Sequence, residues 1–175
     1  MIATNLAVTE ALDLESTNGQ VTVEDLSART VVLATSNGAI ELTRVQADSV
    51  TASTTNGAVE VDQVSFGGPT ACHLELGTTN GAVTGSAQAT MTTVPDCALT
   101  ADTTNGEISL EIGTNGGSCH DLAGTFSLST TNGQSAGEAR GSAMVAGSVV
   151  NGGGGDTFSA SSTNGQVELL FGDCL

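Results

Sequence analysis

Hydrophobic and polar residues alternate along most of this chain, on both sides of a repeated Asn-Gly pair. Six residues before the asparagine stands Leu, Val or Phe, and four residues before it stands Leu or Ala. Three residues after it stands Val or Ile in six of the seven repeats. An alternation with period two is typical of β-strands that bury one face. We therefore predict one strand before and one strand after each Asn-Gly pair.

The Asn-Gly pairs lie inside one phrase, Ser/Thr-Ser/Thr-Asn-Gly. Successive asparagines of this phrase are 19, 19, 24, 25, 27 and 32 residues apart. The first units therefore share a period of 19 residues, and the later units carry inserts. A phrase repeated in this way indicates an array of one structural unit. Its asparagines are Asn18, Asn37, Asn56, Asn80, Asn105, Asn132 and Asn164.

Two architectures fit an Asn-Gly pair between alternating segments. One is a series of hairpins, since Asn-Gly suits a type I′ turn. The other is a β-solenoid, in which each Asn-Gly is a corner and equivalent strands stack in parallel. A third apolar position, eight residues after asparagine at Leu26, Val45 and Val64, favours a solenoid coil with three short sides. A corner asparagine can also hydrogen-bond along the stack and tolerates the left-handed conformation.

We predict an all-β fold, a single-stranded β-solenoid of about seven coils with a basic 19-residue period and inserts in the later coils. The chain, residues 1–175, is expected to be a single domain. Residues 1–11 would form an N-terminal cap or partial coil, and residues 166–175 a closing strand. The Gly-rich insert 138–156 is the largest, and it is the expected partner-contacting region because recognition is concentrated in loops on rigid scaffolds. Residues 151–158 resemble a single calcium-binding β-roll nonapeptide, although a flexible Gly-rich loop is the preferred interpretation.

The Thr/Ser-Asn-Gly phrase followed by alternating valines resembles an adhesin family of secreted β-solenoid repeat proteins from bacteria and fungi. The resemblance extends from about Leu12 to Phe171. It implies a secreted solenoid that binds a surface ligand, and no catalytic motif comes with it.

The charge of the chain limits the classes of molecule that it can bind. Nineteen acidic residues against three arginines and no lysine give a net charge of −16. This excludes nucleic acid as a partner, because such binding depends on phosphate neutralisation, and it disfavours anionic lipids. No apolar run is long enough for membrane insertion. We interpret the acidity as a means of solubility that also limits end-to-end or edge self-association, since solenoid ends expose strand edges.

Four acidic residues of the first coils share outward positions. Glu41 and Glu60 lie four residues after asparagine, and Glu24 and Asp62 lie six residues after it. Carboxylates on adjacent rungs repel each other by roughly 1 kcal/mol in water. Calcium would relieve that repulsion and is the one cofactor that the pattern raises. A solvated acidic face without a cofactor is the preferred interpretation.

The four cysteines indicate an oxidising compartment. Cys72 and Cys97 each lie eight residues before the asparagine of their own repeat, so they share a column. Stacked rungs are about 4.8 Å apart, which a disulfide accepts, and we predict a Cys72–Cys97 bond. Cys119 and Cys174 remain as the second pair. An extracellular or cell-surface location follows, although the first residues carry no secretory signal.

No constellation of side chains indicates catalysis. The basic residues are few, tyrosine is absent, and no local motif supports a Ser-His-Asp arrangement. Cys72-His73 and Cys119-His120 have the wrong spacing for structural zinc. We therefore predict a non-enzymatic, adhesin-like protein whose surface ligand is a carbohydrate or a protein. An extracellular polysaccharide-active β-helix enzyme is the alternative, and an ice-binding protein with a column of threonines before the asparagines is a third.

Overall fold

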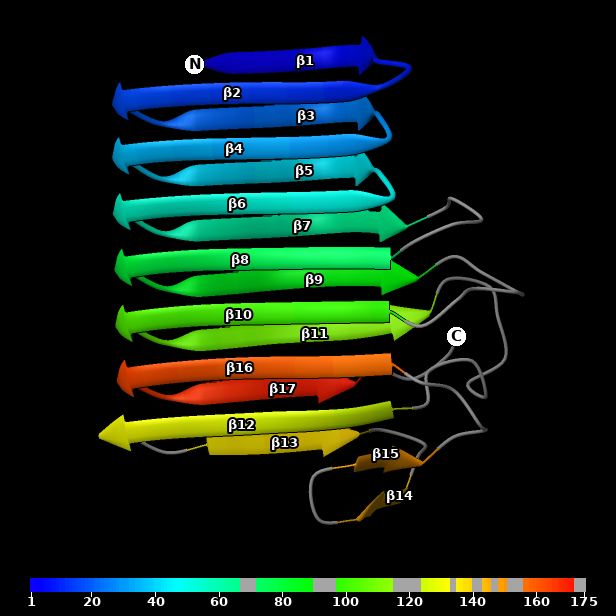
Figure 1. The fold of residues 1–175 in the computed structure, drawn as a ribbon, viewed down its shortest axis with the longest axis vertical. Helices are drawn as coiled ribbons and strands as arrows, with labels where there is room; N and C mark the ends of the chain where they lie inside the picture. The colour runs from blue at the N-terminus through cyan, green and yellow to red at the C-terminus, as the bar shows by residue number, and fades with distance from the viewer. Residues whose placement is uncertain are drawn as a thin grey trace.

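The computed structural model describes residues 1–66, 72–89, 97–114, 124–132, 135–139, 143–145, 148–150 and 156–171. These residues form β-strands joined by tight corners (Figure 1). They contain no helix that is long and apolar enough to cross a membrane. The strands are β1 (Ile2–Ala7), β2 (Ala11–Asn18), β3 (Val21–Ser27), β4 (Thr30–Asn37), β5 (Ile40–Gln46), β6 (Ser49–Asn56), β7 (Val59–Phe66), β8 (Cys72–Asn80), β9 (Val83–Ala89), β10 (Cys97–Asn105), β11 (Ile108–Thr114), β12 (Gly124–Asn132), β13 (Ser135–Ala139), β14 (Ala143–Val145), β15 (Ser148–Val150), β16 (Asp156–Asn164) and β17 (Val167–Phe171).

The strands stack into two sheets. Sheet A has the order β1-β3-β5-β7-β9-β11-β17-β13, and sheet B has the order β14-β15-β12-β16-β10-β8-β6-β4-β2. Each coil contributes one strand to sheet B, turns at Asn-Gly, and contributes the next strand to sheet A. Neighbouring coils pair in parallel and in register, with Asn18 opposite Asn37 and Asn37 opposite Asn56. The β-solenoid prediction is therefore confirmed, and the hairpin alternative is wrong because the strands flanking each Asn-Gly belong to different sheets.

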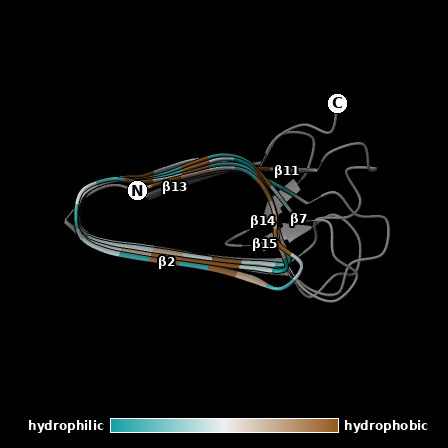
Figure 2. Ribbon diagram, turned by 90° about the horizontal axis from the view of Figure 1, so that it is seen from above, coloured by the Kyte–Doolittle hydropathy of each residue, from teal (hydrophilic) through white to brown (hydrophobic). Residues whose placement is uncertain are grey.

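The coil has two long sides rather than the three short sides expected (Figure 2). The expectation was wrong because the residue seven positions after asparagine adopts a left-handed conformation, with φ of 51° at Asp25, 53° at Arg44 and 56° at Gln63. This extra residue is absorbed as a bulge, so the next inward position falls in the same strand. The bulge ends at β9, where Val64 of β7 pairs with Ala87 after a shift of register.

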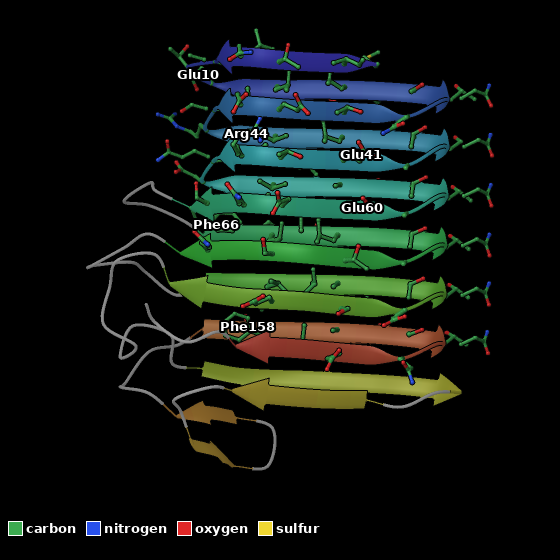
Figure 3. All side chains as sticks on the ribbon, turned by 180° about the vertical axis from the view of Figure 1, so that it is seen from behind. Glu10, Glu41, Arg44, Glu60, Phe66 and Phe158 are labelled. Atoms are coloured by element: carbon green, nitrogen blue, oxygen red, sulfur yellow. The ribbon has the colours of Figure 1, made fainter. Side chains whose placement is uncertain are left out.

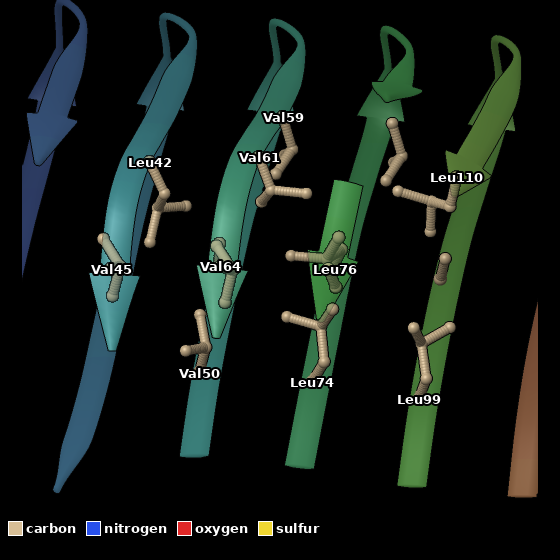
Figure 4. Close-up of a cluster of buried hydrophobic side chains, with 14 of the residues drawn as sticks. Leu42, Val45, Val50, Val59, Val61, Val64, Leu74, Leu76, Leu99 and Leu110 are labelled. Atoms are coloured by element: carbon tan, nitrogen blue, oxygen red, sulfur yellow. The ribbon is translucent and has the colours of Figure 1, made fainter. Parts of the chain in front are cut away.

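Aliphatic side chains from the two sheets meet between them and form the core (Figure 4). The inward positions that the alternation predicts are buried; for example, Leu42, Val61 and Leu74 are each at most 1% exposed. Full burial of one such side chain stabilises the fold by about 1.5–3 kcal/mol. No buried side-chain nitrogen or oxygen in the described residues lacks a hydrogen-bond partner. The apolar stripe along each coil therefore holds the two sheets together.

The Asn-Gly corner is built from contacts between successive coils. The amide Nδ2 of Asn56 donates to Oδ1 of Asn37 at 3.0 Å, and the ladder continues to Asn80 at 2.9 Å. The buried hydroxyl of Thr54, two residues before the asparagine, donates to the carbonyl oxygen of Gly38 at 3.0 Å. Among the described corners no asparagine has a positive φ. The asparagines therefore serve as ladder rungs, and the left-handed conformation that asparagine tolerates is not used at these corners.

The stack does not follow the chain order at its C-terminal end. In Figure 1 the coil β16–β17 lies between the coil β10–β11 and the coil β12–β13. Val167 and Leu169 of β17 are 1% and 0% exposed, whereas the residues opposite them in β13 are Ser135 and Gly137. The more apolar coil thus takes the interior position. Residues 167–171 consequently do not close the stack, and residues 172–175 lie outside the described part.

The ends of the stack are formed by short strands. At the N-terminal end, β1 pairs with β3 as a partial coil. At the other end, β14 and β15 form an antiparallel pair, and β15 pairs with the edge of β12. These two strands belong to the insert 138–156, whose residues 140–142, 146–147 and 151–155 lie outside the described part. The described portion of the insert therefore covers part of a strand edge.

Candidate binding surface on sheet A

The outer face of sheet A carries an open hollow of about 650 Å³. It spans β5, β7, β9 and β11, so four coils contribute to it. The outward residues on either side of each buried position supply carboxylates and hydroxyls, while the backbone of the inward positions lies beneath them. The lining residues are Glu41, Leu42, Thr43, Glu60, Val61, Asp62, Thr84, Gly85, Ser86, Ser109 and Glu111.

The strand register explains how the acidic residues reach this hollow. Glu41 of β5 lies directly opposite Glu60 of β7, and Figure 3 shows the two side chains on neighbouring strands. Thr43 lies opposite Asp62 in the adjacent outward column. The hydroxyl of Ser86, on β9, donates to Oδ1 of Asp62 at 3.5 Å. The hollow therefore presents carboxylates in two columns, with hydroxyl groups between and beyond them.

The four acidic residues singled out from the sequence do not converge on one point. Glu24 lies opposite Thr43, which in turn lies opposite Asp62, so two rungs, or roughly 10 Å of stack, separate Glu24 from Asp62. Glu24 is not part of the hollow lining. Within the described residues, no three Asp, Glu, His or Cys side chains form a group that could hold a metal ion. The calcium site that the sequence raised as an alternative thus has two carboxylates on adjacent rungs, those of Glu41 and Glu60, without a third acidic, His or Cys ligand grouped with them among the described residues.

Glu111 was missed in the sequence. It lies six residues after Asn105 and thus belongs to the same column as Asp62. Its rung partner on β9 is Ser86. Extending the column alignment beyond the first three coils would have found it. The inserts between coils lengthen the spacing between successive asparagines, but a residue six positions after its asparagine still belongs to the same column. A search based on the 19-residue period alone therefore misses Glu111.

Arg44 neutralises one acidic residue near the hollow, Asp25, through an ion pair. Its Nε and one terminal nitrogen contact the two carboxylate oxygens of Asp25 at 2.6 and 3.0 Å. This bidentate hydrogen bond lowers the pKa of Asp25 and raises the pKa of Arg44, and the charges of Glu24 and Asp62 raise the latter further. Arg29 contacts Glu10 at 3.3 Å. Both arginines of the described part are therefore engaged away from Glu41 and Glu60, whose charges remain available.

The hollow combines carboxylates with hydroxyl groups. Its carboxylates attract cations and accept hydrogen bonds, and its hydroxyls can donate or accept. The one imidazole in the described part, that of His73, lies on sheet B and contacts Glu75 at 3.7 Å. Among the described residues, therefore, no histidine lies beside the hydroxyls of Ser86 and Ser109 to act as a general base.

The cysteine positions can be compared with the predicted disulfides. Cys72 of β8 lies directly opposite Cys97 of β10 in the parallel register. This is the backbone relationship that the predicted bond requires, and the bond itself stays a prediction. Cys119 and Cys174 lie outside the described residues, as does His120.

The two Ser/Thr columns before the asparagines have different surroundings. The column directly before asparagine is exposed where it is described, as at Thr55 and Thr79. The column one residue earlier is buried, as at Thr54 and Thr78, and its hydroxyls donate to glycine carbonyls. An ice-binding face would need two exposed threonine columns side by side. The column at Thr54 and Thr78 is buried, so it does not supply the second one.

Comparison with protein families identifies the domain. The family model Toastrack DUF4097 matches residues 4–169, nearly the whole chain. The chain belongs to the Toastrack DUF4097 family. Membership agrees with the repeated β-solenoid coils of the structure. Comparisons with curated proteins and with solved structures gave no match.

Proposed function

We propose that this Toastrack domain is a non-enzymatic, adhesin-like scaffold outside the cell or at its surface, and that the hollow on sheet A binds a basic segment of a partner protein. The observation that carries the proposal is the placement of Glu41, Glu60, Asp62 and Glu111 around one hollow. Their electrostatic field would attract lysine and arginine side chains and steer their approach.

The scaffold suits recognition because it fixes the spacing of the outward residues. Successive rungs are about 4.8 Å apart, and the buried positions beneath the hollow lock each strand in register. The backbone therefore loses little conformational freedom when a partner binds, and the cost of ordering falls on the side chains. Guanidinium groups can make paired hydrogen bonds to carboxylates, which favours arginine-containing segments.

A protein partner is favoured over a carbohydrate by the composition of the surface. The chain has neither tryptophan nor tyrosine. Phe66 and Phe158 are each 3% exposed, so neither offers an exposed ring on which a sugar could stack. The charged groups of the hollow are acidic, and a basic peptide complements them. The register of Cys72 and Cys97 supports an oxidising, extracellular setting, because it permits a disulfide there.

Calorimetric titration of the full chain with a hexalysine peptide and a hexaarginine peptide tests the proposal. The variant E41Q/E60Q/D62N removes three carboxylates while keeping similar side-chain shapes. We expect it to weaken binding roughly tenfold, since each exposed ion pair contributes a fraction of a kcal/mol. Binding should also weaken when the salt concentration rises, because the screening length falls from about 10 Å at 0.1 M to about 3 Å at 1 M.

The matched control is D13N/E15Q/E75Q, which removes the same charge from the outer face of sheet B. These three residues are exposed, and the control should bind the peptides within about twofold of the unmodified chain if the site is local. Equal weakening in both variants would mean that only net charge matters, and the proposal of a site on sheet A would then be abandoned. Binding of a neutral oligosaccharide without binding of either peptide would favour the carbohydrate partner instead.

A further inference from the structure

The coil β16–β17 fills a gap between two other coils of the same chain. In sheet B, β16 pairs with β10 on one side and with β12 on the other. In sheet A, β17 pairs with β11 and β13. We call the gap between the coil β10–β11 and the coil β12–β13 the acceptor slot. It is filled by a segment near the C-terminal end of the sequence, residues 156–171.

The acceptor slot has specific features that match this segment. Asn164 Nδ2 donates to Oδ1 of Asn105 at 2.8 Å, and Ser162 Oγ donates to the carbonyl oxygen of Gly106 at 3.0 Å. The amide of Gly106 donates to the carbonyl oxygen of Asn164 at 3.0 Å. A Cβ on residue 165 would lie 1.7 Å from the oxygen of Gly106, so Gly165 is required there. The Ser/Thr-x-Asn-Gly phrase supplies each of these contacts through Ser162, Asn164 and Gly165.

The slot also selects for apolar residues. Val167 and Leu169 are buried, and Leu169 lies opposite Leu110 of β11. The corresponding position of β13 is Gly137, which would leave Leu110 without that partner. The corner and the apolar strand together therefore explain why residues 156–171 take the slot and residues 124–139 lie beyond it.

We propose that the acceptor slot also takes residues 156–171 of a second copy, so that two chains form a dimer by exchanging this coil. The exchanged coil makes the same contacts as the chain's own coil, as in other cases of domain swapping. The balance between the two forms is set by the effective concentration of the chain's own segment, which is on the order of millimolar for a segment tethered through a short linker. The chain between β13 and β16 has sixteen residues, 140–155. A fully extended chain of that length spans roughly 50 Å, which reaches a neighbouring chain once the β14–β15 pair has opened.

Cysteine pairs in full-length chains test the exchange. Thr100 of β10 lies opposite Ser159 of β16, and Ser159 lies opposite Ser127 of β12. A chain carrying T100C is unfolded and refolded together with a chain carrying S159C, oxidised mildly, and digested for mass spectrometry. A disulfide between residues 100 and 159 of different chains reports exchange. The matched control mixes T100C with S127C, whose positions are two rungs apart in the stack.

If the coil is exchanged, the fraction of chains joined by a 100–159 disulfide will exceed the fraction joined by a 100–127 disulfide. At about 0.1 mM roughly a tenth of the chains should be linked, and tenfold dilution should lower that fraction about tenfold. Links between chains that are no more frequent for 100–159 than for 100–127 would overturn the proposal. The double variant T100C/S159C must also form the bond within one chain. If it does not, residues 156–171 do not fill the slot, and the proposal is likewise overturned.

Discussion

The glycines of adjacent corners approach so closely that no side chain fits between them: a Cβ on residue 57 would lie 2.1 Å from the carbonyl oxygen of Gly38. Residue 57 also has a φ of 157°. The corner glycine is therefore required by contact with the preceding coil as well as by its own backbone conformation. The corner column thus couples each coil to the next, and its substitution has a direct consequence for stability.

Replacing Gly57 with alanine should destabilise the domain by at least about 2 kcal/mol, because overpacking against backbone atoms forces the coils apart. The measurement is urea unfolding followed by far-ultraviolet circular dichroism. Gly77→Ala is the control, since a Cβ there would meet nothing within 4 Å. Equal midpoints for the two variants would show that the corner does not need glycine.

The buried hydroxyl of Thr54 provides a second test of the corner. The substitution Thr54→Val keeps the shape but removes the donor to the Gly38 carbonyl oxygen. We expect a loss of about 1–2 kcal/mol, since a buried acceptor is left unpaired. Thr55→Val, at the exposed neighbouring position, should change the free energy of unfolding by less than about 0.5 kcal/mol. Similar losses in both variants would argue against a structural role for the buried threonine column.

The Asp25–Arg44 pair predicts a dependence of stability on pH. Arg44 lowers the pKa of Asp25 below its ordinary value of 3.8. The unfolded chain therefore binds this proton first, and the pair's contribution is present above pH 3.8 and is lost as the pH falls through the lowered pKa. Asp25→Asn should lower the unfolding midpoint slightly at neutral pH. Below the lowered pKa of Asp25, where the carboxyl is protonated, the variant and the unmodified chain should have the same midpoint. The contribution should be small because both groups are exposed. A difference between the two proteins that grows toward acid pH would have the wrong sign.

The Cys72–Cys97 bond can be tested by mass spectrometry of a digest made without reduction. We expect a peptide that links the two residues. Because the closed loop has about 25 residues, loss of the bond in Cys72→Ser/Cys97→Ser should reduce the free energy of unfolding by about 3 kcal/mol. Linkage of either cysteine to Cys119 or Cys174 would contradict the column assignment.

The alternation and the 19-residue period predicted the solenoid because every coil must bury the same face at the same place. The number of sides was not predictable in this way. A left-handed residue such as Arg44 leaves no trace in an apolar pattern, since it is neither glycine nor asparagine. The pattern at Leu26 and Val45 therefore looked like the start of a third side.

The order of the last coils was also hidden in the sequence. The segments 124–132 and 156–164 carry nearly the same phrase, so the corner sequence alone does not determine which of them lies next to β10. The difference lies in β13 and β17, where Gly137 stands opposite Leu169. The acidic hollow was partly predictable, since Glu41 and Glu60 share a column. Glu111 also lines the hollow, because the inserts in the later coils do not change its position relative to Asn105.

The proposed function places recognition of a basic partner on the outer face of sheet A of this Toastrack domain. The most direct measurement is an NMR titration of the full, isotope-labelled chain with the hexaarginine peptide, read as shifts of backbone amide signals. The account predicts that the largest shifts occur in β5, β7, β9 and β11, at Thr43, Asp62, Ser86 and Glu111. Shifts concentrated on sheet B or in the insert 138–156, with sheet A unaffected, would contradict it.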